Sequence, residues 1–110
     1  MSDPIPETVT EFFALDARHD HDAVLALFAD DAVVVDERQT MEGHDAIRAW
    51  REGPVSKYTY TTEILGGEKI TPSRYLVRGR LTGDFPGGVV ELRWDFTLED
   101  GRIARLVIAP

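Results

Sequence analysis

The sequence predicts an α+β fold in which helices come first and an antiparallel sheet follows. Apolar residues recur at helical spacing in the first half of the chain, and from Lys57 onward they alternate with polar ones. Glycine- and proline-containing turns separate the alternating segments. A chain of 110 residues is long enough for one hydrophobic core but not for two. We therefore expect residues 1–110 to form one domain.

Two helices are expected at the start of the chain. The first follows Pro6. One of its faces carries, at helical spacing, Val9, Phe12, Phe13 and Asp16. A polar stretch, residues 18–22, breaks this pattern, and Asp20 or Asp22 is suited to cap a second, short helix. The apolar stripe of that second helix consists of Val24, Leu27 and Phe28.

A strand and a third helix are expected next. Residues 32–35 are a β-branched run that is typical of a strand. The third helix begins near Gly43 and places Ile47 and Trp50 on its inner side. It ends at Gly53-Pro54, because proline cannot continue a helix. The first half of the chain is thus mainly helical, with one strand before its last helix.

The second half is expected to form four sequential antiparallel strands. Apolar and polar residues alternate within each strand, so one face is apolar and the other charged. The expected hairpin turns are Gly66-Gly67, Pro86-Gly87-Gly88 and Asp100-Gly101. The charged face carries Arg74, Arg78, Arg80, Glu91, Arg93 and Asp95. Opposite charges on neighbouring strands contribute roughly 0.2–1 kcal/mol per pair, and we expect Asp95 to pair with Arg78 or Arg80.

Composition and charge exclude several classes of function. The net charge of −8 argues against nucleic-acid and anionic-membrane partners, because phosphate binding needs clustered Lys and Arg. The chain contains no cysteine, so it has neither disulfides nor thiolate metal sites. No apolar stretch approaches the roughly 20 residues of a membrane-spanning helix, and the first residues do not resemble a signal peptide. We expect a cytoplasmic protein that binds neither membrane nor nucleic acid.

Three segments carry a resemblance to a known family. They are residues 22–33 (DAVLALFADDAV), residues 42–50 (EGHDAIRAW) and the closing strand pair around residues 94–96 and 100–103. Together with the order of the elements, they resemble the nuclear-transport-factor-2-like superfamily, in its SnoaL-like and ketosteroid-isomerase-like branch. The resemblance implies a cone-shaped fold with three N-terminal helices packed on a curved, mainly antiparallel sheet. It does not imply one reaction, because the members share a scaffold rather than a chemistry.

The resemblance also implies an internal pocket for a small hydrophobic molecule, since an apolar lining with a few polar groups suits such a ligand. The expected lining residues are Phe12, Phe28, Trp50, Tyr60, Tyr75, Trp94 and Phe96. The alternative is that these aromatic side chains fill the core. We expect no cofactor and no metal, because the adjacent residues 19–22 lack a defined coordination geometry and His19 and His21 read as loop residues. The outer sheet face is either exposed to solvent or the contact of a homodimer. We expect the dimer, because an uncovered four-stranded face is a large surface for so small a protein.

Asp36 is the candidate general base. It follows the apolar strand and by alternation shares a face with Ala32 and Val34. The resemblance places the general-base aspartate of ketosteroid isomerases at this position. A carboxylate beside apolar walls loses hydration, so its pKa rises and it becomes a competent base. The alternative is a solvated aspartate that starts a turn before Glu37.

Tyr58, Tyr60 and His44 are the candidates to polarise a substrate carbonyl. The acidic hydrogen-bond donors of ketosteroid isomerases are missing, since Phe12 and Trp94 occupy the matching positions. We therefore expect a SnoaL-like enzyme of isomerase, cyclase, dehydratase or hydrolase type that acts on a hydrophobic carbonyl, polyketide or terpenoid-like compound. The alternative is a non-catalytic homodimeric domain of the same fold that binds a ligand or another protein.

Overall fold

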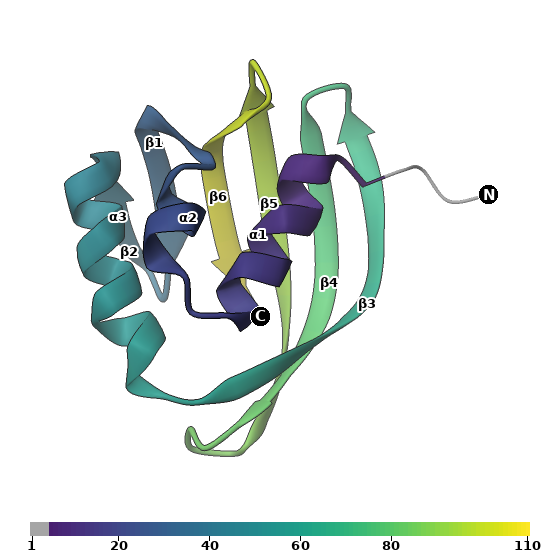
Figure 1. Ribbon diagram of the computed structural model, residues 1–110. Coiled ribbons are helices and arrows are strands. Elements are labelled where there is room, and N and C mark those ends of the chain that lie inside the picture. The colour runs from purple at the N-terminus through teal and green to yellow at the C-terminus, as the bar shows by residue number, and fades with distance from the viewer. Residues whose placement is uncertain (1–4) are drawn as a thin grey trace.

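In the computed structural model, which describes residues 5–110, six strands form one mixed sheet and the helices cover one of its faces (Figure 1). The helices are α1 (Glu7–Ala17), α2 (His21–Leu25) and α3 (Gly43–Glu52), and a 3₁₀ helix, η1 (Pro54–Lys57), follows α3. The strands are β1 (Phe28–Asp36), β2 (Gln39–Glu42), β3 (Tyr60–Thr71), β4 (Arg74–Gly83), β5 (Val89–Glu99) and β6 (Arg102–Ala109). The predicted α+β class is confirmed.

The first helices lie where the sequence predicts them, but the second is shorter. The Asp20 side chain caps α2 by accepting a hydrogen bond from the Ala23 amide at 3.2 Å. The expectation that Phe28 belongs to this helix is wrong, because β1 begins there. The Leu27 carbonyl accepts a hydrogen bond from the Ile103 amide at 2.8 Å, which draws this segment into the sheet. His21 is also not a loop residue, since it begins α2.

The sheet has the strand order β2-β1-β6-β5-β4-β3. The predicted antiparallel succession of β3, β4, β5 and β6 is confirmed, and β1 joins it by pairing in parallel with β6. Strand β2 was not predicted. It forms a hairpin with β1 through Glu37 and Arg38, whose φ angles of 51° and 65° are those of a tight hairpin turn. No glycine or asparagine marks this turn in the sequence.

Of the predicted glycine turns, two are confirmed. Gly87 and Gly88, and likewise Asp100 and Gly101, have positive φ angles in the β4–β5 and β5–β6 turns. Gly66-Gly67 is not a turn but lies inside β3, beside an irregularity in the pairing with β4. A Cβ atom at Gly66 would lie 2.9 Å from the Arg78 guanidinium, which extends from β4 over β3. Glycine at this position therefore leaves space for the arginine side chain.

The outer face carries the predicted cross-strand ion pairs, with one exchange of partners. Arg80 on β4 contacts Glu63 at 3.3 Å and Glu91 at 3.4 Å. Asp95 pairs with Arg74 at 2.6 Å, not with Arg78 or Arg80. Arg78 lies opposite Arg93 in the β4–β5 register and its guanidinium lies against Gly66, which leaves Arg74 as the diagonal partner of Asp95.

The core lies between α1 and the inner face of the sheet and is held by aromatic contacts. The Phe12 ring meets the rings of Phe28 and Phe96 edge to face, and the Phe13 ring meets that of Trp94 in the same way. Such pairs add about 0.5–1.5 kcal/mol beyond the burial of their surface. These contacts hold α1 against β5.

Among residues 5–110, no helix has the length and apolar character needed to cross a membrane.

Candidate functional site

Asp36 lies half-buried at the end of β1, on the inner face that also carries the buried Ala32 and Val34. This placement is as predicted. The indole N–H of Trp50, on α3, donates a hydrogen bond to Asp36 Oδ2 at 2.9 Å. Burial raises the pKa of Asp36 above its ordinary value of 3.8, while the bond from Trp50 opposes the rise and the nearby Glu37 charge adds to it. The carboxylate is thus both oriented and made more basic.

Replacing Trp50 by phenylalanine should raise the pKa of Asp36 further, because the hydrogen bond that favours the charged carboxylate is lost. A carboxyl-detected NMR titration measures this shift. Trp94→Phe is the matched control, since Trp94 is equally buried, at 5% exposure, but its ring packs against Phe13. A pKa of Asp36 that stays unchanged in Trp50→Phe, or that falls, would show that the indole does not stabilise the carboxylate.

A buried ion pair joins helices α1 and α3. Asp16 of α1 and Arg51 of α3 are 7% and 1% exposed, and the Arg51 Nη1 donates to Asp16 Oδ1. The Tyr60 hydroxyl, from β3, donates to both Asp16 carboxylate oxygens at 3.1 Å. Burial first, and then the Asp16 charge, raise the pKa of Tyr60, and the Asp36 charge adds to the rise. Tyr60 therefore stays protonated and is bound to Asp16 within electrostatic reach of Asp36.

His21 and Ser56 extend this polar network. Arg51 Nε donates to His21 Nδ1 at 3.2 Å. Because Nδ1 accepts this bond, a neutral His21 carries its proton on Nε2, which lies 3.0 Å from Ser56 Oγ. The Ser56 hydroxyl donates in turn to the Arg51 carbonyl at 2.7 Å. Together with Asp16 and Tyr60, the network ties α1, α2, α3, η1 and β3 to one another at a single arginine.

Two predicted catalytic residues lie elsewhere. Tyr58 precedes β3, where its ring packs against Phe85 and lies under the Lys57 ammonium. His44 is in the first turn of α3, about 9 Å along the helix axis from Trp50. Its Nε2 lies 3.0 Å from the Phe28 carbonyl oxygen and 4.0 Å from Asp30. The structure thus does not bring Tyr58 or His44 together with Asp36, and His44 instead joins α3 to β1.

The aromatic residues expected to line a pocket divide into two groups. Trp50 and Tyr60 make polar contacts, Trp50 with Asp36 and Tyr60 with Asp16. The others pack in the core or at its border. Phe12, Phe28, Trp94 and Phe96 are buried and contact one another or Phe13, and Tyr75 is half-buried with its hydroxyl on the Pro72 carbonyl at 3.2 Å. Their rings fill the space between α1 and the sheet, so in this part of the molecule the aromatic side chains form the core.

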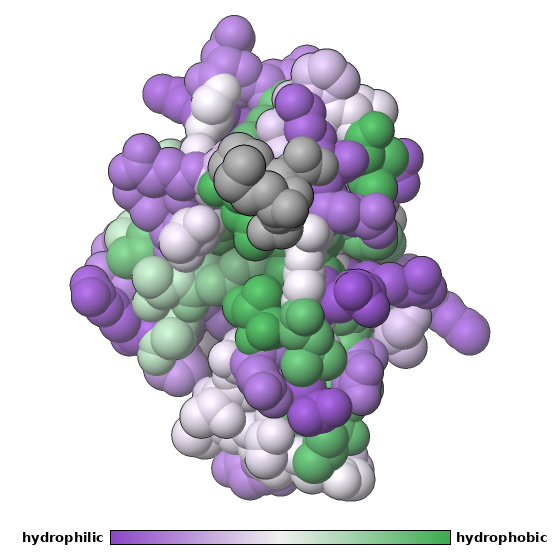
Figure 2. Space-filling view, turned by 90° about the vertical axis from the view of Figure 1, so that its right-hand side faces the viewer, coloured by the Kyte–Doolittle hydropathy of each residue, from purple (hydrophilic) through white to green (hydrophobic). Residues whose placement is uncertain are grey.

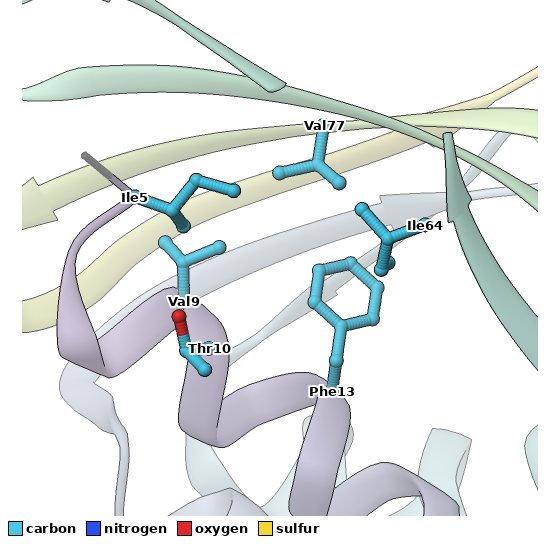
Figure 3. Close-up of a pocket in the computed structure, with 6 residues that line it drawn as sticks. All are labelled: Ile5, Val9, Thr10, Phe13, Ile64 and Val77. Carbon is cyan, nitrogen blue, oxygen red and sulfur yellow. The ribbon is translucent and has the colours of Figure 1, made fainter. Parts of the chain in front are cut away.

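An apolar crevice lies at the other side of α1, between this helix and strands β3 and β4 (Figure 3). Its volume is about 160 Å³. The side chains that line it are Ile5, Val9, Thr10, Phe13, Ile64 and Val77. On the face of the molecule shown in Figure 2, green apolar patches alternate with purple polar residues. None of the aromatic residues that were expected to line a pocket lines the crevice.

Sequence reasoning missed the polar network, although one signal for it is present. Asp16 shares a helix face with Val9, Phe12 and Phe13, and an acidic residue in an apolar stripe needs a buried partner. That partner, Arg51, is four residues after the inward-facing Ile47 and thus on nearly the same side of α3. No local pattern pairs the two, because they are 35 residues apart.

Comparisons with known proteins show the family and the fold of the chain. The family model for the SnoaL-like domain matches residues 9–106. A solved structure from Sinorhizobium meliloti, of a protein provisionally named a polyketide cyclase, is 39% identical, with 96% of this chain and 95% of that one covered and a TM-score of 0.89. No curated protein matches the sequence.

Two solved structures of lower identity share the fold. A protein with a ketosteroid-isomerase-like fold from Catenulispora acidiphila, in complex with trimethylamine, is 19% identical over 97% of this chain and 87% of that one, with a TM-score of 0.85. A Mycobacterium tuberculosis protein in complex with estradiol-17β-hemisuccinate is 18% identical over 94% and 90% of the two chains, with a TM-score of 0.80.

Proposed function

Because the chain belongs to the SnoaL-like domain family, we propose that it is an enzyme for a small hydrophobic carbonyl compound, with Asp36 as the general base. The observation that carries the proposal is the state of this carboxylate. It is half-buried at the end of the apolar inner face, held by the Trp50 indole, and has a raised pKa. A base of this kind is stronger than a solvated aspartate and has a fixed direction of attack.

The proposed chemical step is removal of a proton from the carbon next to the substrate carbonyl. The electron pair of the broken C–H bond moves into an enolate, and the proton moves to Asp36, which returns it to another atom. Isomerase, cyclase and dehydratase reactions share such a step. The name of the Sinorhizobium meliloti relative and the steroid derivative in the Mycobacterium tuberculosis structure support a substrate with hydrophobic rings.

Tyr60 is not assigned the role of carbonyl donor. Its hydroxyl donates to both oxygens of Asp16 and would have to leave a buried carboxylate to reach a substrate. We assign it instead a structural role, because its hydroxyl links β3 to the buried Asp16–Arg51 pair within electrostatic reach of Asp36.

Exchange of protons for deuterons tests the proposal even where the final product of the reaction is unidentified. A panel of cyclic ketones is incubated with the protein in D₂O, and ¹H NMR follows the loss of signal at the carbon next to the carbonyl. We expect exchange above the buffer rate for the substrate-like members, increasing with pH as Asp36 loses its proton. Ketones that bind without faster exchange at any pH would favour the non-catalytic ligand-binding alternative.

A second copy of the chain is the proposed partner of the outer sheet face. On this face, half-buried Val33, Val35 and Val107 lie beside the ion pairs of β4 and β5. This mixture of apolar side chains and opposite charges suits a self-complementary contact. Sedimentation equilibrium tests it through the molecular mass in solution.

A further inference from the structure

We propose that the crevice between α1 and the edge strand β3 binds a small uncharged hydrocarbon ring, about the size of benzene, at a site separate from Asp36. The inner wall of the crevice is part of the core, since Val9 is 0% and Val77 1% exposed. Its rim is open, since Ile5 and Ile64 are 37% and 43% exposed. In Figure 3 these side chains and Phe13 point toward one another across the space.

The size and chemistry of the lining select the ligand. Five of the six lining side chains are hydrocarbon, and Thr10 carries the single hydroxyl. An enclosed apolar cavity of about 150 Å³ is known to bind benzene. The crevice has a comparable volume of about 160 Å³, with its inner wall in the core and its rim open to solvent. No lining residue carries a charge, so an ionised ligand would lose its hydration without compensation.

The crevice and Asp36 are at opposite ends of one row of paired residues. Val77 pairs with Trp94, Trp94 with Ile108 and Ile108 with Asp36. Three strand spacings separate the ends, which is about 14 Å. The Phe13 ring packs against Trp94, with 5.2 Å between the ring centroids. These two rings lie between the crevice and Asp36. A ring bound in the crevice therefore does not reach Asp36, and the inference goes beyond the proposed function.

Titration with benzene, followed through the ¹³C-labelled methyl groups of isoleucine and valine, tests this site. We expect saturable shifts at Ile5, Val9, Ile64 and Val77. Ile64→Trp should weaken binding at least about tenfold, because the indole occupies the crevice. Ile70→Trp is the matched control, since Ile70 lies on the same strand with the same 43% exposure but does not line the crevice. It should bind benzene like the wild type, and so should Asp36→Asn.

Four outcomes would overturn the proposal. They are the absence of saturable shifts at the crevice methyl groups, unchanged binding in Ile64→Trp, equal loss in Ile70→Trp, and shifts that centre on Ile108 instead. If Ile64→Trp does not fold, Thr10→Phe replaces it, because the exposed Thr10 lines the crevice from α1. Loss of binding in the folded Thr10→Phe variant supports the site, and retained binding refutes it. The ketone exchange assay fails or succeeds independently, since it reports on Asp36.

Discussion

Replacing Arg51 by methionine is expected to lower the free energy of unfolding by about 3–5 kcal/mol, the usual consequence of removing one partner of a buried ion pair. Asp16 would keep its buried charge and retain only the Tyr60 hydroxyl among its side-chain partners in the network, and His21 would lose the donor at its Nδ1. Urea denaturation followed by circular dichroism measures the loss.

Arg48→Met is the matched control for this prediction. Arg48 is on the same helix and pairs with Asp22 at 2.7 Å, but both side chains are largely exposed, at 44% and 83%. Exposed pairs contribute about 0–1 kcal/mol. Adding Asp16→Asn to Arg51→Met should restore part of the lost stability, because no unpaired charge then remains. A loss in Arg51→Met no larger than that in Arg48→Met would show that the buried network does not hold the helices to the sheet.

Asp36→Asn is expected to reduce turnover by about 10²–10⁴-fold, the contribution of a positioned general base. The amide oxygen still accepts the Trp50 hydrogen bond, so the fold and the affinity for ligand should persist. Ketone exchange rates and ligand titrations of the two proteins give the comparison. Asp31→Asn, an exposed position on the same strand, is the control and should exchange like the wild type.

The same variant should be more stable than the wild type at neutral pH. A carboxyl group whose pKa is raised by folding binds its proton more tightly in the folded state. Proton binding by Asp36 therefore adds to the free energy of unfolding. This addition is complete at pH values below the ordinary pKa of 3.8 and is lost as the pH rises through the raised pKa of Asp36. Asparagine carries no charge and avoids this loss.

The turnover of Asp36→Asn is the other test. If this variant turned substrate over as fast as the wild type, Asp36 would not be the general base.

The elements with a strong local pattern could be predicted from the sequence. Alternation placed Asp36 on the inner face of β1, because a period of two fixes the side of every residue in a strand. The tight turn at Asp100-Gly101 was predictable for a similar reason, since such turns need positive φ. Ion pairs across β4 and β5 were predictable in kind, but their partners depend on the register.

The rest depends on contacts between distant segments. Strand β2 is defined by its pairing with β1, and the turn between them, at Glu37 and Arg38, lacks the glycine or asparagine that usually marks such a turn. Phe28 has a helical spacing but joins the sheet beside Ile103, which lies far along the chain. The Asp16–Arg51 pair also joins distant segments, so a single acid on an apolar helix face was its sole trace in the sequence.

The most direct measurement of the central claim is the titration of the Asp36 carboxyl carbon by NMR in the wild-type protein. The midpoint should lie above the ordinary value of 3.8 and should coincide with the pH at which ketone exchange increases. A midpoint at or below 3.8, or a pH profile of exchange that does not follow it, would contradict the assignment of Asp36 as the base.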